Sequence, residues 1–349
     1  MKNLPFNTQI KHPASGFISH YPVFKPKNNI FPLDILSCEK LLEEWFGLPV
    51  ILLASGRSGI HLYLQQKKYN RYKHKLHVPK YLSRCVLNTL TKNVFPIENS
   101  YESHGLLLYH QYGFPQLCNP KSNLIIEDIA HSFFSTPNSG KRLWFGEVGI
   151  FSLPKFFPIK GLAGGLIVPN NNTAKKIRLA LSNYPAEDTP TRKWMQKVVA
   201  NSFPHQTTSS VFLDSVYELL STFIHPNLSN LEGFPSSIDG IRQIGKIRLE
   251  RVMFFKSFFK KQSIPSTFWN SKEIIIPFAL PYFGKDNKNL QKTDTSLKKN
   301  GFLAGIYNVD INRNMNNPNY KQCLLLPCHQ NISMKQFKTM CQIVKNNDI

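Results

Sequence analysis

The first folded region of the chain combines an apolar stripe at helical spacing with a short, continuous apolar run. Four apolar residues between positions 41 and 46 recur at helical spacing, and Gly47 follows them. This stretch predicts a helix that begins near Ser37 and ends at the glycine. The apolar run at 50–53 then predicts a buried strand, which turns through residues 55–59 into another helix.

Two apolar runs in the middle of the chain predict neighbouring strands that end in reactive side chains. The first ends in Glu127 and Asp128, and the second ends in Ser152, with Lys155 shortly after it. Ligands of α/β sheets bind at such strand ends. A buried carboxylate needs a cationic partner, and a lysine in a largely apolar loop tends towards a lowered pKa and nucleophilicity. The residues therefore predict Schiff-base chemistry.

The turn between the early strand and its helix is a candidate phosphate site. It reads SGRSG at 55–59, so backbone N–H groups and the positive end of a helix dipole would face the strand end. Gly56, Arg57 and Ser58 are the candidate residues. A tight strand-to-helix turn without a ligand explains the same string equally well.

The remaining pattern predicts a larger and a smaller α/β unit. Residues 1–37, rich in Pro, Asn and Lys, predict an extended arm, and a Pro/Gly/Ser/Asn-rich connection at 227–237 predicts a boundary between domains at 1–230 and 231–349. His110, at a predicted strand end, could line a pocket or be merely hydrogen-bonded. Further strands are expected at 93–97, 106–110, 274–280 and 322–326, with loops between the last two, and further helices at 174–181, 211–223, 238–260 and 334–344.

Composition and charge narrow the class of protein. Of 349 residues, 42% are hydrophobic and 12% are aromatic, as in an ordinary globular protein. The start lacks an apolar signal region, and no apolar window reaches 18 residues, so we expect a cytoplasmic protein without a membrane segment. No spacing typical of a metal site or disulfide framework joins the six cysteines, Cys38, Cys85, Cys118, Cys323, Cys328 and Cys341.

The formal net charge of +22 invites a nucleic-acid interpretation. The lysines and arginines are nevertheless spread over the whole chain, often beside asparagine, and no nucleic-acid-binding motif accompanies them. We interpret the charge as a compositional bias of the surface and expect no specific nucleic-acid partner. A non-catalytic protein that binds acidic polymers is the alternative.

The central segments resemble the DegT/StrS-type sugar aminotransferases, which are fold-type-I enzymes dependent on pyridoxal phosphate (PLP). That family has a strand reading E-D-x-A-Q/H, followed by G-D/E-x-G-x-F-S, a lysine and a Gly-Gly strand. This chain has EDIAH at 127–131, GEVGIFS at 146–152, Lys155, and glycines at 164 and 165. The resemblance implies a three-layer α/β/α large domain with a mixed, mostly parallel sheet, plus a smaller C-terminal α+β domain.

The resemblance also implies roles for individual residues. Asp128 would pair with the pyridine nitrogen, His131 would lie beside the phenolate oxygen of PLP, and Lys155 would be the Schiff-base lysine. Lys160 competes for that last role because it lies closer to the two glycines. Ser152 and the turn containing Gly56, Arg57 and Ser58 would bind the phosphate, and Tyr81, in the family-like segment VPKY, is the candidate for stacking on the ring.

The activity that follows from the resemblance is transfer of an amine from glutamate or glutamine to a keto-sugar nucleotide, in aminosugar or surface-polysaccharide biosynthesis. A PLP- or PMP-dependent dehydratase or lyase of the same fold is the alternative. The resemblance further implies a homodimer. A segment that in this family comes from the second subunit lacks its usual asparagine and arginine here, at 233–237.

Overall fold

The computed structural model describes most of the chain. Some sequence-based predictions lie outside the described part: the helix expected at 211–223 (except its last residue), Cys118, and most of the expected N-terminal arm. The described residues are 17–25, 33–98, 101–117, 122, 124–136, 146–184, 190, 194, 223–259, 266–269 and 273–347.

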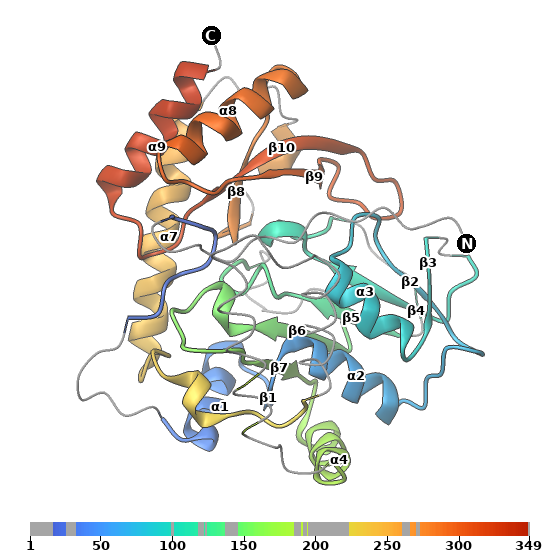
Figure 1. The fold of residues 1–349 in the computed structure, drawn as a ribbon. Helices are drawn as coiled ribbons and strands as arrows, with labels where there is room; N and C mark the ends of the chain where they lie inside the picture. Colours follow the sequence, from blue (N-terminus) through green and yellow to red (C-terminus); the bar gives the residue numbers. More distant parts are fainter. Residues whose placement is uncertain are drawn as a thin grey trace.

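A seven-stranded sheet is the centre of the larger part of the molecule (Figure 1). Its spatial order is β1-β7-β6-β5-β4-β2-β3; β7 is antiparallel to both of its neighbours, and the other pairs are parallel. The mixed, mostly parallel sheet that we expected is confirmed. The strands are β1 (Val50–Leu53), β2 (Lys75–His77), β3 (Phe95–Ile97), β4 (Gly105–Tyr109), β5 (Ile125–Asp128), β6 (Val148–Ser152) and β7 (Gly164–Ile167).

Alternating strand residues build a separate core on each face of this sheet. In β1, Val50 and Leu52 pack into one core, whereas Ile51 and Leu53 pack into the other. Helices α1 (Ile35–Phe46) and α7 (Ile238–Phe258) cover the first face, and α2 (Gly56–Gln66), α3 (Arg84–Thr91) and α4 (Asn171–Ser182) cover the second. The three-layer α/β/α architecture is thus confirmed.

A second, smaller sheet carries the C-terminal part of the chain. It has the order β8-β10-β9 and is antiparallel throughout, with the strands β8 (Ala279–Tyr282), β9 (Ile306–Asp310) and β10 (Tyr320–Pro327). Helices α8 (Asn287–Lys299) and α9 (Met334–Asn347) pack against each other beside it. Short 3-10 turns complete the described elements: η1 (Gln111–Gly113), η2 (Leu153–Lys155), η3 (Leu228–Leu231) and η4 (Ser266–Trp269).

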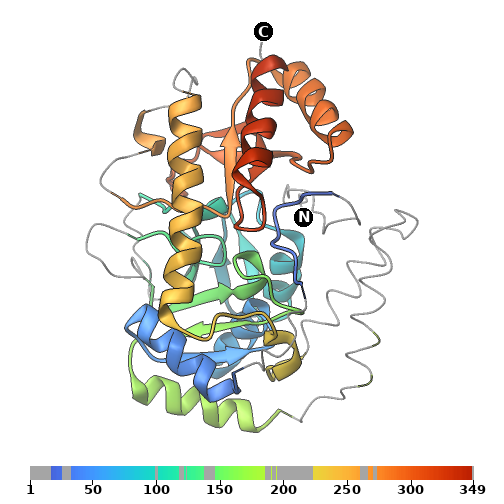
Figure 2. The ribbon, with the colours of Figure 1, turned by 90° about the vertical axis from the view of Figure 1, so that its left-hand side faces the viewer.

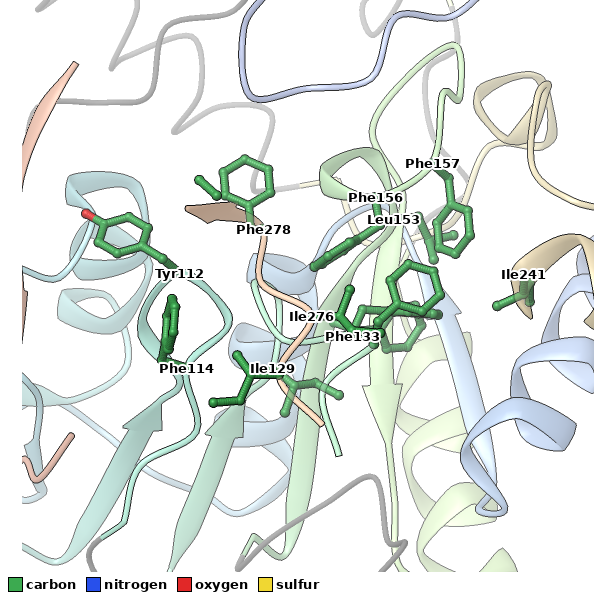
Figure 3. Close-up of a cluster of buried hydrophobic side chains, with 14 of the residues drawn as sticks. Tyr112, Phe114, Ile129, Phe133, Leu153, Phe156, Phe157, Ile241, Ile276 and Phe278 are labelled. Atoms are coloured by element: carbon green, nitrogen blue, oxygen red, sulfur yellow. The ribbon is translucent and has the colours of Figure 1, made fainter. Parts of the chain in front are cut away.

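Helix α7 runs along both sheets and joins them (Figure 2). Its first half contributes Ile241 to the core beside α1, and its second half contributes Val252 and Phe255 to the core of the small sheet. An aromatic cluster between the two sheets draws residues from both sides of the expected boundary, including Phe133, Phe156 and Phe278 (Figure 3). The division at residue 230 stays a prediction.

Helix α1 begins earlier than its sequence predicts. Ser37 lies inside the helix, and the N-cap is Asp34, whose carboxylate accepts hydrogen bonds from the Ser37 backbone N–H at 2.9 Å and from its hydroxyl at 2.7 Å. Aspartate is as good a cap as serine, so two candidate caps three residues apart leave the start ambiguous. Gly47 ends the helix as expected, with a φ of 69°.

The sequence interpretation missed two C-terminal elements, α8 and β9. Helix α8 lies in a stretch rich in Asn and Lys that we expected to be a loop, and its buried face has only two apolar residues, Leu290 and Leu297, beside Thr293 and Asp294. Asp286 caps it by accepting from the backbone N–H of Asn289 at 2.8 Å. A narrow stripe in a polar helix gives a weak periodic signal.

Candidate active site

A cavity lies at the carboxyl ends of β5 and β6, beneath the N-termini of α2 and α3. Asp128 reaches it from β5, Ser152 from the end of β6, and Lys155 from η2. The expected convergence of acid, hydroxyl and amine is therefore present. The cavity is lined by Tyr21, Ser55, Gly56, Arg57, Ile60, Ser83, Cys85, Val86, Asp128, Ala130, His131, Ile150, Ser152, Pro154, Lys155, Leu162 and Ala163.

Lys155 is held in a largely apolar turn. Its Nζ lies 2.8 Å from Nε2 of His131, and its backbone carbonyl accepts a hydrogen bond from the buried Arg248 guanidinium at 3.2 Å. Burial lowers the pKa of Lys155, and the nearby Asp128 carboxylate opposes this shift by raising it. A lysine in this state has an increased fraction of nucleophilic amine.

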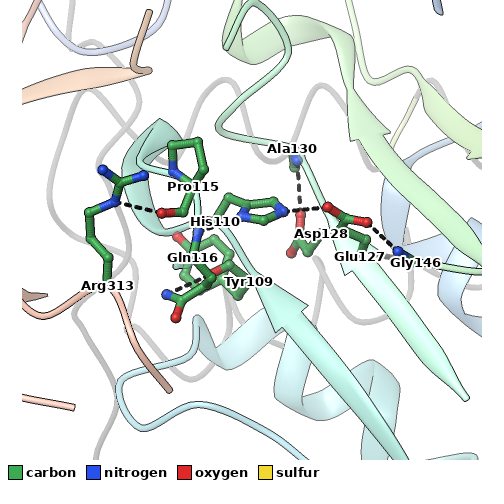
Figure 4. A network of polar contacts seen from close by, with 9 residues as sticks. All are labelled: Tyr109, His110, Pro115, Gln116, Glu127, Asp128, Ala130, Gly146 and Arg313. Atoms are coloured by element: carbon green, nitrogen blue, oxygen red, sulfur yellow. Dashed lines mark hydrogen bonds and ion pairs between the residues drawn. The ribbon is translucent and has the colours of Figure 1, made fainter. Parts of the chain in front are cut away.

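Asp128 is the electrostatic counterpart of Lys155. Its side chain is 4% exposed, and Oδ1 accepts a hydrogen bond from the Ala130 backbone N–H at 2.9 Å (Figure 4). Burial raises its pKa, while the charge of Lys155, the Ala130 hydrogen bond and His110 act in the opposite direction. The site thus holds a carboxylate whose charge depends on a cationic neighbour.

Glu127 and His110 form a buried pair beside the site rather than within the cavity lining. Nδ1 of His110 accepts from the Gln116 backbone N–H at 3.0 Å, so Nε2 carries the proton and donates to Glu127 at 2.7 Å (Figure 4). The other Glu127 oxygen accepts from the Gly146 backbone N–H at 2.6 Å. Of the two roles open to His110, the structure shows the hydrogen-bonded one.

The imidazole of His131 packs against aromatic rings. Tyr112 and Phe278 lie nearly parallel to the imidazole, at centroid distances of 5.5 and 4.7 Å. Tyr109 Oη lies 2.5 Å from Nδ1, on the side opposite Lys155. Burial, the charge of Lys155 and His20 all lower the pKa of His131 well below its usual range, so the ring is neutral.

The turn at 55–59 contributes to the cavity differently from its sequence-based prediction. Gly56 and Arg57 line the cavity, and Ser55 joins them. Ser58 does not, because its fully buried hydroxyl donates to the Phe223 carbonyl at 2.7 Å while its backbone N–H donates to the capping Ser55. Gly56 is required here: a Cβ would lie 2.9 Å from the Phe151 carbonyl oxygen.

Two further candidates lie away from the cavity lining. Tyr81 packs edge-on against Tyr320 at 4.8 Å, and Ser83, Cys85 and Val86 occupy the nearby wall instead. The stacking role expected of Tyr81 thus has no geometric support, because its backbone turns the ring towards the small sheet. Lys160 is exposed and forms an ion pair with Glu232 at 2.8 Å.

Sequence reasoning missed several residues of the site. Tyr21 comes from the N-terminal segment, and Phe278, which stacks on His131, precedes β8; neither position carries a local signal that points to the cavity. Tyr109 could have been found, since it ends β4 at the same sheet edge as Asp128. Because ligands of α/β sheets bind at strand ends, considering the last residues of every predicted strand would have included Tyr109.

The comparisons with known proteins agree with this geometry. A family model described as "Putative PLP-dependent aminotransferase" matches residues 47–347. The chain belongs to this family. It is therefore an aminotransferase that uses PLP, and the non-catalytic alternative is wrong. Among curated proteins, none matches the chain in sequence.

Solved structures with the same fold include aminotransferases of low sequence identity to this chain. A DegT DnrJ EryC1 StrS aminotransferase from Brucella abortus is 14% identical, with a TM-score of 0.62 over 91% of each chain. DesV from S. venezuelae is 14% identical, with a TM-score of 0.60 over 91% of each chain. Sugar aminotransferase CalS13 from Micromonospora echinospora is 12% identical, with a TM-score of 0.61 over 94% of this chain and 99% of that one.

The residues of the cavity fit the cofactor of the family. An amine with a lowered pKa, a buried carboxylate and the N-terminus of helix α2 line one space. These are the groups needed to bind an aldehyde, a pyridine nitrogen and a phosphate. Among the described residues, no helix is long and apolar enough to cross a membrane.

We expect Asp128→Asn to lower the pKa of Lys155 further, because it removes the charge that opposes the effect of burial. The measurement is the pH dependence of Lys155 reductive methylation in cofactor-free protein, followed by mass spectrometry. Its midpoint should move to lower pH. Asp286→Asn, which alters a distant helix cap, is the control and should leave the midpoint in place; a midpoint that rises in Asp128→Asn would contradict the assigned pairing.

Glu127→Ala should destabilise the fold by roughly 1–3 kcal/mol, because the buried imidazole of His110 loses its acceptor. The half-buried Gly146 amide also loses its acceptor, at a smaller cost. The free energy of unfolding in urea checks this value. In the control, Asp239→Ala removes an exposed partner of Arg242 and should cost less than about 1 kcal/mol. Equal losses in the two variants would show that the buried pair contributes nothing particular.

Proposed function

We propose that the enzyme transfers an amine from glutamate or glutamine to a keto-sugar nucleotide, in aminosugar or surface-polysaccharide biosynthesis. The observation that carries the proposal is the meeting of Lys155 and Asp128 in one cavity of a sugar-aminotransferase fold. Arg57 at the cavity wall and the positive charge of the chain favour an anionic substrate such as a nucleotide diphosphate. We further propose a homodimer in the cytoplasm.

Each residue of the cavity would have a separate role in such a reaction. PLP, when bound, supplies an electron sink for the carbon that loses its proton. Lys155 would attach the cofactor, and its lowered pKa suits it to move a proton between two carbons. Asp128 would hold the proton on the pyridine nitrogen, and His131 would lie on the phenolate side. Ser152, with the backbone of Gly56 and Arg57, would hold the phosphate.

A dehydratase or lyase of the same fold is the second candidate. Members of the family with that activity replace the Schiff-base lysine, whereas this chain keeps a lysine in the cavity. Incubation with PLP, ¹⁵N-labelled glutamate or glutamine and a panel of keto-sugar nucleotides separates the candidates. A product that gains the label indicates an aminotransferase acting on that class; a dehydrated product without the label indicates the alternative.

Borohydride reduction in the presence of PLP should fix the cofactor on Lys155. We expect Lys155→Ala to lose the label, because no other lysine lines the cavity within the described residues. Lys160→Ala is the matched control and should keep it, since Lys160 forms a surface ion pair with Glu232. Peptide mass spectrometry locates the label, and a label on Lys160 that persists in Lys155→Ala would refute the assignment.

A further inference from the structure

Hydrogen bonds connect Tyr109 to His131 and His131 to Lys155, and the charge of Lys155 decides which atom donates in each of them. Lys155 Nζ lies 2.8 Å from His131 Nε2, and Tyr109 Oη lies 2.5 Å from His131 Nδ1. An ammonium group has no lone pair and can only donate. When Lys155 is protonated, Nε2 must therefore accept, and the proton of the neutral imidazole must sit on Nδ1. Tyr109 Oη is the partner that accepts from it.

The surroundings of His131 leave it little freedom to find another partner. The rings of Tyr112 and Phe278 both stack on the imidazole, and both His131 and Tyr109 are less than 10% exposed. Lys155 from η2, Tyr109 from β4 and Tyr112 from η1 contact His131, and His20 from the N-terminal segment acts on its pKa. Asp128 from β5 acts on both Lys155 and Tyr109. Burial raises the pKa of Tyr109 well above its usual value, so its hydroxyl stays neutral.

We propose that Tyr109 is a positioning residue that holds His131 as the Nδ1–H tautomer and so lets Nε2 accept from Lys155. A neutral hydroxyl can also donate, in which case Nδ1 accepts and Nε2 carries the proton. The same pair can then present an N–H to an anionic oxygen of a bound cofactor. The contact with a cofactor oxygen rests on the proposed function. The hydrogen bond from Lys155 to Nε2 is a property of the cofactor-free chain.

Tyr109→Phe would abolish both arrangements of the hydrogen bond between position 109 and His131. The Nδ1–H of His131 would be buried without an acceptor whenever Lys155 is charged, so the charged form of Lys155 becomes less favourable. Tyr109→Phe should therefore lower the pKa of Lys155. At a fixed pH below the midpoint, its reductive methylation should become faster, by about tenfold for each pH unit that the midpoint falls.

The decisive measurement is ¹⁵N NMR of cofactor-free protein labelled on its histidines, with the His131 signal assigned by its loss in His131→Gln. Below the Lys155 midpoint, wild-type protein should show a protonated Nδ1 and an unprotonated Nε2. In Tyr109→Phe that tautomer should be lost and the methylation midpoint should fall. Tyr63→Phe is the matched control, because it removes another buried hydroxyl, one that donates to Glu147 far from the cavity.

Two results would overturn the proposal. One is an Nε2–H tautomer or an imidazolium in wild-type protein, and this result stands even if Tyr109→Phe fails to fold. The other is a Tyr109→Phe protein whose tautomer and midpoint match those of Tyr63→Phe. Protein that shows the Nδ1–H tautomer but fixes no PLP with borohydride would refute the proposed function while leaving the role of Tyr109 intact.

Discussion

The site depends on the attraction between a buried carboxylate and a half-buried amine. Burial pushes Asp128 and Lys155 towards their neutral forms, and each group opposes the shift of the other. Inside a cavity this attraction is stronger than it would be at the surface. The two residues therefore act as one electrostatic unit. A ligand that separates them must offer each a replacement, as a protonated ring nitrogen and a reactive carbonyl do.

The sheet brings this unit together through close backbone packing. A Cβ on Gly164 would lie 2.5 Å from the Gly56 amide nitrogen and 2.5 Å from the Phe151 carbonyl oxygen. The N-terminus of α2 can thus reach the ends of β6 and β7 only because both positions are glycine. Arg248 of helix α7 holds the turn that carries Lys155: it lies over the Phe156 ring at 4.6 Å and donates to the Lys155 carbonyl.

The central strands and the paired residues could be predicted because each leaves a local signal, whereas the layers and the mixed sheet followed from the family resemblance. Asp128 and Lys155 follow apolar strands, and parallel strands share an edge. Tyr81 and Ser58 were assigned to the site wrongly, because the local backbone conformation that orients their side chains leaves no pattern in the sequence. Tyr81 has a φ of 60°, which turns its ring away from the cavity, and Ser58 is turned towards Phe223, 165 residues later. Tyr21 reaches the cavity only through long-range contacts of the N-terminal segment.

A small part of the positive charge of the sequence is internal. Arg248, Arg251 and Arg313 are buried, and each donates to backbone carbonyls of distant segments: Arg251 to Ile332, and Arg313 to Pro115 and Phe268. Arg313 also pairs with Glu273. These guanidinium groups donate hydrogen bonds to buried backbone carbonyls around helix α7 and the small sheet. They therefore add to the formal charge without adding to a basic surface, and a polyanion-binding interpretation based on that charge counts cations that no polymer can reach.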